Sequence, residues 1–259
     1  MIVPRLLPAG TPDGDGHRTR DIVFSPDGRT MYISVGSSSN VDDVDNNPAE
    51  FHRANILEGD PDGGELRVYA SGIRNPVGLA VDPDNGDVWT SVNERDALGD
   101  NLPPDYVTHV QRGGFYGWPW YYTGGNQDPR HAGRHPELRS QVIVPDVLIQ
   151  PHNASLGLTF YTGEQFPADF WGDLFAAEHG SWNKQVRTGY EVIRIRRAFV
   201  RATGEYEDFL TGFVTTDGRV WGRPVGVAVA ADGSLMVSDD GSNAIWRVRY
   251  EPRPPRDDR

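Results

Sequence analysis

The sequence contains no cysteine, a single lysine (Lys184) and no long hydrophobic run. Without cysteine the chain forms neither a disulfide framework nor a zinc–cysteine site, and it has no thiolate nucleophile. A formal net charge of −12 argues against a duplex-binding surface, because nucleic-acid affinity depends mainly on clustered cations. No apolar run approaches the roughly 20 residues needed to cross a bilayer. The composition therefore predicts an acidic globular protein with no nucleic-acid partner and no transmembrane segment.

Helical periodicity is also scarce, whereas glycine and proline are frequent, with 30 and 20 residues among 259. They divide the chain into short runs of alternating polarity bounded by turn residues, a pattern typical of all-β proteins. The hydrophobic fraction of 37% is low. Large aromatic rings supply much of the apolar surface that a core needs.

Four segments share one plan of a strand, a tight turn, a second strand and a polar loop. They are residues 21–38, 78–95, 226–243 and, with a longer turn, 157–180. Repeated hairpin units of this kind predict β-propeller blades, each a four-stranded sheet around a central channel. A β-sandwich with coincidentally similar hairpins is the alternative.

The four units are spaced more widely than the blades of a small four-bladed propeller. We therefore expect a partial propeller over residues 1–250, with further blades of a larger ring missing before Met1. The opening residues, MIVPRLLPAG, are too short and too proline-rich for a signal peptide. Residues 251–259 are charged and proline-rich, which predicts a disordered, solvated tail.

Several polar residues adjoin these repeats. His17 precedes the first repeat and is a candidate general base, or else a loop histidine with one hydrogen bond. Arg74 and Arg223 each stand just before the first strand of a repeat. A guanidinium at a channel mouth suits a carboxylate or phosphate, although pairing with a surface aspartate is the simpler interpretation.

Three further stretches are rich in oxygen ligands or in rings. Residues 93–96 (NERD) offer carboxylates and carbonyls to a hard cation such as Ca²⁺, with 42–47 and 82–87 as competitors, the last interpreted as a turn. Residues 113–120 (GGFYGWPW) form either a stacking platform or a loop packed onto a sheet. Signatures of dinucleotide sites, P-loops, serine-esterase elbows and zinc hydrolases are absent from the sequence.

Seven ordered blocks resemble the pyrroloquinoline quinone (PQQ) dependent sugar dehydrogenases, the sorbosone dehydrogenase branch in particular. The blocks are HRTRDIVFSPDG, YISVGSSSN, GIRNPVGLAVD, VNERDALGD, GGFYGWP, AEHGSWNK and GRPVGVAV. Each block is weak alone, but their order and spacing extend over nearly the whole chain. The resemblance implies a six-bladed propeller that holds PQQ and Ca²⁺ at the top of its channel.

The resemblance also implies residue roles. His17 matches the general base that takes the substrate hydroxyl proton while hydride moves to the quinone. The matches to cofactor-binding positions are Arg74, Asn75, Asn93 and Arg223, with Lys184 or Arg187 as a further cation. Glu94 and Arg95 match calcium-binding positions, through backbone carbonyls.

Two departures from the family pattern concern the site. Soluble glucose dehydrogenases place an aspartate near the catalytic histidine where this chain has Ser37, and a second cofactor arginine where it has Val225. The sorbosone branch resembles this chain better at both positions. Relatives also extend well upstream of the catalytic histidine, whereas His17 stands near the start of this chain.

The predicted function is therefore a PQQ-dependent, calcium-requiring oxidoreductase that takes hydride from an aldose, sorbosone or similar sugar. Its partners are a sugar substrate and an electron acceptor, a quinone or a cytochrome. The resemblance implies a periplasmic or secreted protein. Two alternatives stay open: a truncated, non-catalytic propeller scaffold, and a calcium-dependent lactonase or phosphoesterase.

Overall fold

The computed structural model describes residues 16–64, 66–198 and 200–252. The first fifteen residues of the predicted propeller and residues 253–259 of the predicted tail lie outside this part of the chain. The described helices are short 3₁₀ turns: Pro48–Glu50, Pro129–His131, Pro136–Gln141 and Ala168–Phe170. None of the helices in these ranges is long and apolar enough to cross a membrane.

The first two sheets are antiparallel and four-stranded. The first contains β1 (Ile22–Phe24), β2 (Met31–Val35), β3 (Asn55–Gly59) and β4 (Arg67–Ser71). The second contains β5 (Pro76–Val81), β6 (Val88–Val92), β7 (Tyr106–His109) and β10 (Val147–Leu148). A long excursion between β7 and β10 carries a small hairpin, β8 (Tyr121–Tyr122) with β9 (Asn126–Gln127).

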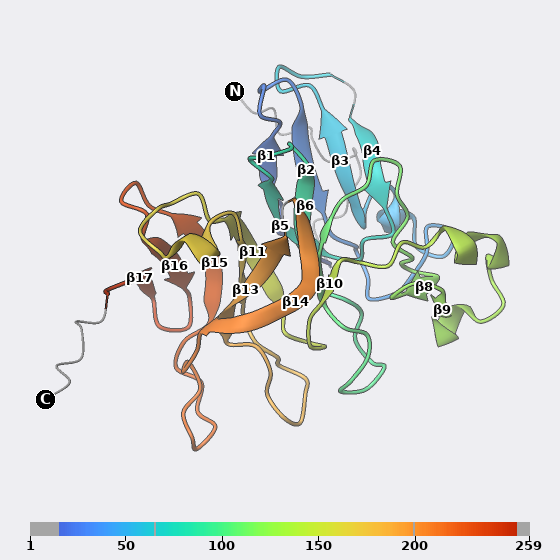
Figure 1. Ribbon diagram of the computed structural model, residues 1–259. Helices are drawn as coiled ribbons and strands as arrows, with labels where there is room; N and C mark the ends of the chain where they lie inside the picture. The colour runs from blue at the N-terminus through green and yellow to red at the C-terminus, as the bar shows by residue number, and fades with distance from the viewer. Residues whose placement is uncertain (1–15, 65, 199, 253–259) are drawn as a thin grey trace, which may run out of the picture.

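Two more sheets complete the described part of the chain. The third contains β11 (Ser155–Phe160), β12 (Leu174–Glu178), β13 (Glu191–Ala198) and β14 (Arg201–Leu210). The fourth contains β15 (Pro224–Val229), β16 (Leu235–Asp239) and β17 (Ala244–Val248). Figure 1 shows the sheets following one another from the blue first sheet to the red fourth sheet.

Each predicted repeat forms the first hairpin of one sheet: β1–β2, β5–β6, β11–β12 and β15–β16. The all-β, propeller-type prediction is therefore confirmed, and the sandwich alternative is not needed. Residues 82–87 are the turn between β5 and β6, as expected.

The first strands of neighbouring sheets lie against one another: β1 contacts β5, β5 contacts β11, and β11 contacts β15. A glycine occupies the close approaches along this row. A Cβ atom on Gly78 would lie 2.4 Å from the carbonyl oxygen of Leu156, and one on Gly157 would lie 2.9 Å from the Cα atom of Gly226. At Gly78 and Gly157 the neighbouring strand therefore lies too close for a residue with a Cβ atom.

Apolar side chains fill the spaces between adjacent sheets. Ile56 and Val88 belong to one buried cluster between the first and second sheets. Trp89 packs against Phe160 between the second and third sheets, with ring centroids 6.1 Å apart. Aromatic rings therefore make up part of the core that aliphatic residues supply elsewhere.

The glycine row generates a prediction about stability. Gly157→Ala should lower the free energy of unfolding by about 1–3 kcal/mol, because the new methyl group meets backbone atoms of β15. Gly64→Ala is the matched control, since its Cβ would meet nothing closer than 3.6 Å. Urea denaturation measures both variants. Equal stability of the two variants would show that the inner strands are not packed this closely.

Candidate active site

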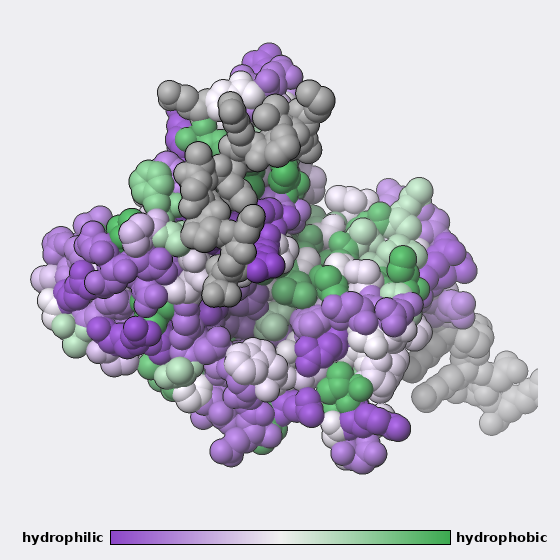
Figure 2. Space-filling view, turned by 180° about the vertical axis from the view of Figure 1, so that it is seen from behind, coloured by the Kyte–Doolittle hydropathy of each residue, from purple (hydrophilic) through white to green (hydrophobic). Residues whose placement is uncertain are grey.

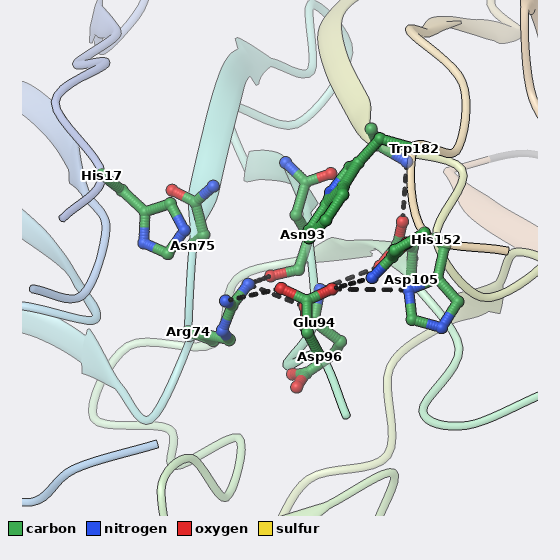
Figure 3. Close-up of a pocket in the computed structure, with 11 residues that line it drawn as sticks. His17, Arg74, Asn75, Asn93, Glu94, Asp96, Asp105, His152 and Trp182 are labelled. Atoms are coloured by element: carbon green, nitrogen blue, oxygen red, sulfur yellow. Dashed lines mark hydrogen bonds and ion pairs between the residues drawn. The ribbon is translucent and has the colours of Figure 1, made fainter. Parts of the chain in front are cut away.

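A pocket of about 180 Å³ lies where the first strands begin and the second strands end. In an antiparallel hairpin these two ends share one edge, so the loops of three sheets converge there. Five predicted residues line the pocket: His17, Arg74, Asn75, Asn93 and Glu94. Asp96 belongs to the 93–96 stretch that was considered for a cation, and five other lining residues were not predicted: Asp105, His152, Ala154, Trp182 and Asn183. Figure 3 shows how most of these side chains surround the space.

His17 is held by Ser37, in the loop that follows β2. Its ring atom Nδ1 lies 3.1 Å from the carbonyl oxygen of Ser37 and 3.1 Å from the Ser37 hydroxyl. The Ser37 hydroxyl itself donates to the carbonyl of Ser39, so both groups act as acceptors toward the ring. Nδ1 therefore carries the hydrogen, and Nε2 keeps its lone pair on the pocket side. Ser37 thus occupies the orienting position that the sequence comparison had assigned to an aspartate in glucose dehydrogenases.

The electrostatic surroundings keep this imidazole neutral. Burial, and then the positive charge of Arg74, lower the pKa of His17 to about 4. Protonating the ring here places a charge in a poorly solvated site beside another cation. At neutral pH His17 is therefore a free base that is able to accept a proton.

Arg74 uses every N–H donor of its guanidinium on the protein. Nε donates to the carbonyl of Asn40 and Nη2 to its side-chain oxygen, at 3.1 and 2.9 Å. Nη1 donates to the carbonyls of Asn93 and Glu94, at 3.2 and 2.7 Å, and Nη2 also lies 3.5 Å from Asp96. Arg74 therefore fixes the loop after β6 and supplies positive charge to the pocket from behind it.

Two carboxyl groups in the pocket have raised pKa values. Burial raises the pKa of Glu94 to about 7 and that of Asp105 to about 6. Asp105 accepts hydrogen bonds from the backbone N–H groups of Glu94 and Ala154, at 2.8 and 2.9 Å. These carboxyl groups exchange protons near neutral pH, so the pocket gains negative charge once a cation offsets their burial.

Three buried amide oxygens, those of Asn75, Asn93 and Asn183, have no hydrogen-bond partner within the described residues. All three residues line the pocket. Amide and carboxylate oxygens are the ligands that Ca²⁺ prefers. No group of three histidine or acidic side chains in the described ranges is arranged to hold a metal alone. The donor set therefore fits a calcium ion that is shared with a bound molecule.

The two predicted calcium residues behave differently. The carbonyl of Glu94 accepts a hydrogen bond from Arg74, and its side chain lines the pocket. The side chain of Arg95 points elsewhere, into a buried ion pair with Asp128 at 2.9 Å. Arg95 is not among the residues that line the pocket.

Arg223, Arg187 and Lys184 are not among the residues that line this pocket, and Arg223 and Arg187 lie at the ring of Tyr190. The guanidinium carbon of Arg223 lies 5.2 Å from the ring centroid, and its Nη1 lies 3.1 Å from Nδ1 of His179. Arg187 donates to the Tyr190 hydroxyl at 3.2 Å, whereas Lys184 has no ion pair in the described structure. The guanidinium groups of Arg187 and Arg223 thus meet at one ring. Of the two alternative cations, Arg187 is therefore the one that shares the surroundings of Arg223.

The ring-rich segment 113–120 packs inside the molecule. Tyr116 and Trp118 are buried, and the Trp118 indole N–H donates to the carbonyl of Asn40 at 3.0 Å. The exposed ring of the pocket is Trp182, whose relative exposure is 76%. The packing interpretation of the segment is therefore correct. Trp118 also helps to fix Arg74, because both side chains donate to the carbonyl of Asn40.

Some lining residues carried a usable signal and others did not. Asp96 lies within the NERD stretch that the sequence offered as cation ligands, and Asn183 stands next to the predicted Lys184. Asp105 and His152 lie in loops without a motif. Nδ1 of His152 lies 3.5 Å from Asp96 only because the loop before β11 folds back onto the loop after β6.

Known families and proteins resemble this chain over most of its length. The family model described as glucose/sorbosone dehydrogenase matches residues 8–183, and a TrAA12-like model matches residues 127–251. An uncharacterized protein of Borreliella burgdorferi is 31% identical over 97% of this chain and 65% of its own length. A PQQ-dependent pyranose dehydrogenase of Coprinopsis cinerea is 26% identical over 92% of this chain and 40% of its own length.

Solved structures show the same fold. A calcium structure of a Trichoderma reesei carbohydrate-active enzyme of family AA12 has a TM-score of 0.74 at 20% identity, covering 90% of this chain and 68% of that one. The holo form of the pyranose dehydrogenase PQQ domain from Coprinopsis cinerea has a TM-score of 0.71 at 24% identity, covering 90% and 70%. The chain thus spans about two thirds of the length of these structures.

The contacts of His17 generate a prediction about its titration. In an NMR pH titration of the wild-type chain, the ring should titrate near pH 4. Ser37→Asp should raise this pKa by about one unit or more, because a carboxylate beside Nδ1 stabilises the imidazolium. Thr203→Asp, on the exposed side of β14, is the control and should leave it unchanged. A wild-type ring that titrates close to 6.5, the value of a free histidine, contradicts this description.

Proposed function

The chain belongs to the glucose/sorbosone dehydrogenase family, and from that premise we propose that it is a PQQ-dependent, calcium-requiring sugar dehydrogenase. The substrate class is an aldose, sorbosone or a similar sugar. One observation carries the proposal: a neutral histidine with a free Nε2 lines a pocket rich in unpaired oxygen ligands. The proposal extends to a periplasmic or secreted location, on the family resemblance alone.

The residues that would hold the cofactor follow from their chemistry. PQQ is a planar tricarboxylate, so it needs fixed cations and hydrogen-bonding groups. Asn75 and Asn93 offer unsatisfied amide groups in the pocket, while Arg187 and Arg223 have no carboxylate partner in the described structure. Glu94, with the loop that Arg74 holds, would carry the calcium ion. Bound in this way, PQQ supplies the hydride acceptor and Ca²⁺ polarises its carbonyl.

The protein's own part in the reaction is proton transfer and positioning. Nε2 of His17 accepts the proton of the substrate hydroxyl that is oxidised, since its lone pair faces the pocket. Ser37 holds the tautomer during this transfer, because its carbonyl accepts the Nδ1 hydrogen bond. The exposed indole of Trp182 stands at the pocket mouth and offers an apolar surface to a sugar ring. These roles require no movement of the backbone.

A second candidate is a calcium-dependent hydrolase of lactones or phosphoesters. Asp96, Asp105 and Asn183 come together in the pocket with Glu94 and Asn93, and of these the sequence had not indicated Asp105 and Asn183. This convergence favours a cation site. The same chain supplied with Ca²⁺ but without PQQ distinguishes the two candidates, because only the hydrolase is then active.

The test is reconstitution with PQQ and Ca²⁺, followed by reduction of an artificial electron acceptor across a panel of aldoses. His17→Asn should lower the turnover rate by roughly 10²–10⁴-fold, the usual contribution of a positioned base. His52→Asn, at an exposed histidine, is the matched control and should keep full activity. PQQ affinity should be similar in both variants. Loss of PQQ binding by His17→Asn would instead assign His17 a structural role.

A further inference from the structure

A second cavity, of about 510 Å³, lies at the opposite edge of the second and third sheets. Its walls come from the β5–β6 turn, the end of β7, the segment before β10, and Val200 with Arg201, where β14 begins. Strand β6 begins at this cavity and ends at the candidate active site. A strand rises about 3.3 Å per residue, so the two sites are separated by about 16 Å. The second cavity is therefore not an extension of the first.

His109 is held in a fixed orientation in this cavity. Its Nδ1 lies 2.7 Å from an oxygen of Asp146, and the same oxygen accepts the hydroxyl of Thr108 at 2.6 Å. The hydrogen bond to Asp146 raises the pKa of His109. Nδ1 is thereby fixed as a donor, and Nε2 has no partner within the described residues. When the ring is protonated, Nε2 presents an N–H donor to the cavity, and the raised pKa of His109 widens the pH range over which it does so.

Arg201 also lines the cavity. It has no ion pair with a described acidic residue. It is close enough to His109 to lower that pKa, while Asp87 raises it. One oxygen of Asp87 accepts a hydrogen bond from Asn85 at 2.9 Å, which leaves the other oxygen available. The side chain of Gln111 also lines the cavity. The cavity lining therefore combines two cationic donors, His109 and Arg201, with the carboxylates of Asp87 and Asp146 and the amide of Gln111.

We propose that this cavity binds a small hydroxylated carboxylate, of the sugar-acid class. The carboxylate of the ligand pairs with Arg201 and the His109 imidazolium, which form charge-assisted hydrogen bonds. Its hydroxyl groups bond to Asp87 and Gln111. A neutral sugar leaves Arg201 without a counter-charge, and inorganic phosphate lacks the chain of hydroxyl groups that reaches both Asp87 and Gln111. This inference does not depend on the proposed dehydrogenase function.

The experiment uses the full chain without PQQ or metal, so that it is independent of the first pocket. Gluconate is titrated while the ring resonances of His109 are followed by NMR, with glucose and inorganic phosphate as comparison ligands. Gluconate should shift these resonances and bind more tightly than either comparison ligand. Binding should weaken from pH 6 to pH 9 as His109 loses its proton. Arg201 is then the one positive charge of the cavity lining beside the negative charges of Asp146 and Asp87.

Variants complete the test. Arg201→Ala should weaken gluconate binding about tenfold or more, the usual cost of losing a charge-assisted hydrogen bond. Arg219→Ala, at an exposed arginine of the β14–β15 connection, should bind gluconate like the wild type. His109→Gln should bind more weakly at pH 6 and lose the pH dependence. Equal binding of glucose or phosphate, no shift at His109, or unchanged binding by Arg201→Ala overturns the proposal.

Discussion

The close approach of the inner strands is the constraint on which the rest of the structure depends. Gly78 and Gly157 have backbone atoms of a neighbouring strand where a side chain would begin. Strands packed so tightly bring their ends together, and the loops attached to those ends converge. The pocket between His17 and Trp182 is therefore a consequence of the strand packing, because its residues belong to three different sheets. The second cavity arises in the same way at the other edge of the strands.

Burial then shapes the electrostatics of the pocket in two opposite directions. It lowers the pKa of His17 and raises those of Glu94 and Asp105, since each group is driven toward its neutral form. Glu94, Asp96 and Asp105 line the pocket, but near neutral pH it holds less negative charge than three carboxylates would give. Arg74 carries the permanent positive charge and is itself fully hydrogen-bonded. Such a pocket is able to gain charge when a cation and an anionic molecule bind together.

The repeat pattern predicted the fold well, since a hairpin and its turn are local features. The family resemblance, together with the position of these residues beside the repeats, predicted five pocket residues. Asp105 and His152 escaped prediction because their position depends on which distant loops meet. The neutrality of His17 was equally hidden, as it depends on burial and on Arg74, 57 positions away in the sequence. The contact of Ser37 with His17 follows from the register of the first sheet.

The central claim is that the convergent pocket holds a quinone cofactor together with a calcium ion. A crystal structure of the chain with PQQ and Ca²⁺ tests it most directly. The account predicts cofactor density in the pocket beside His17, with a cation bound to oxygens of the loop after β6. An intact protein whose pocket remains free of both, or whose cofactor binds elsewhere, would contradict it.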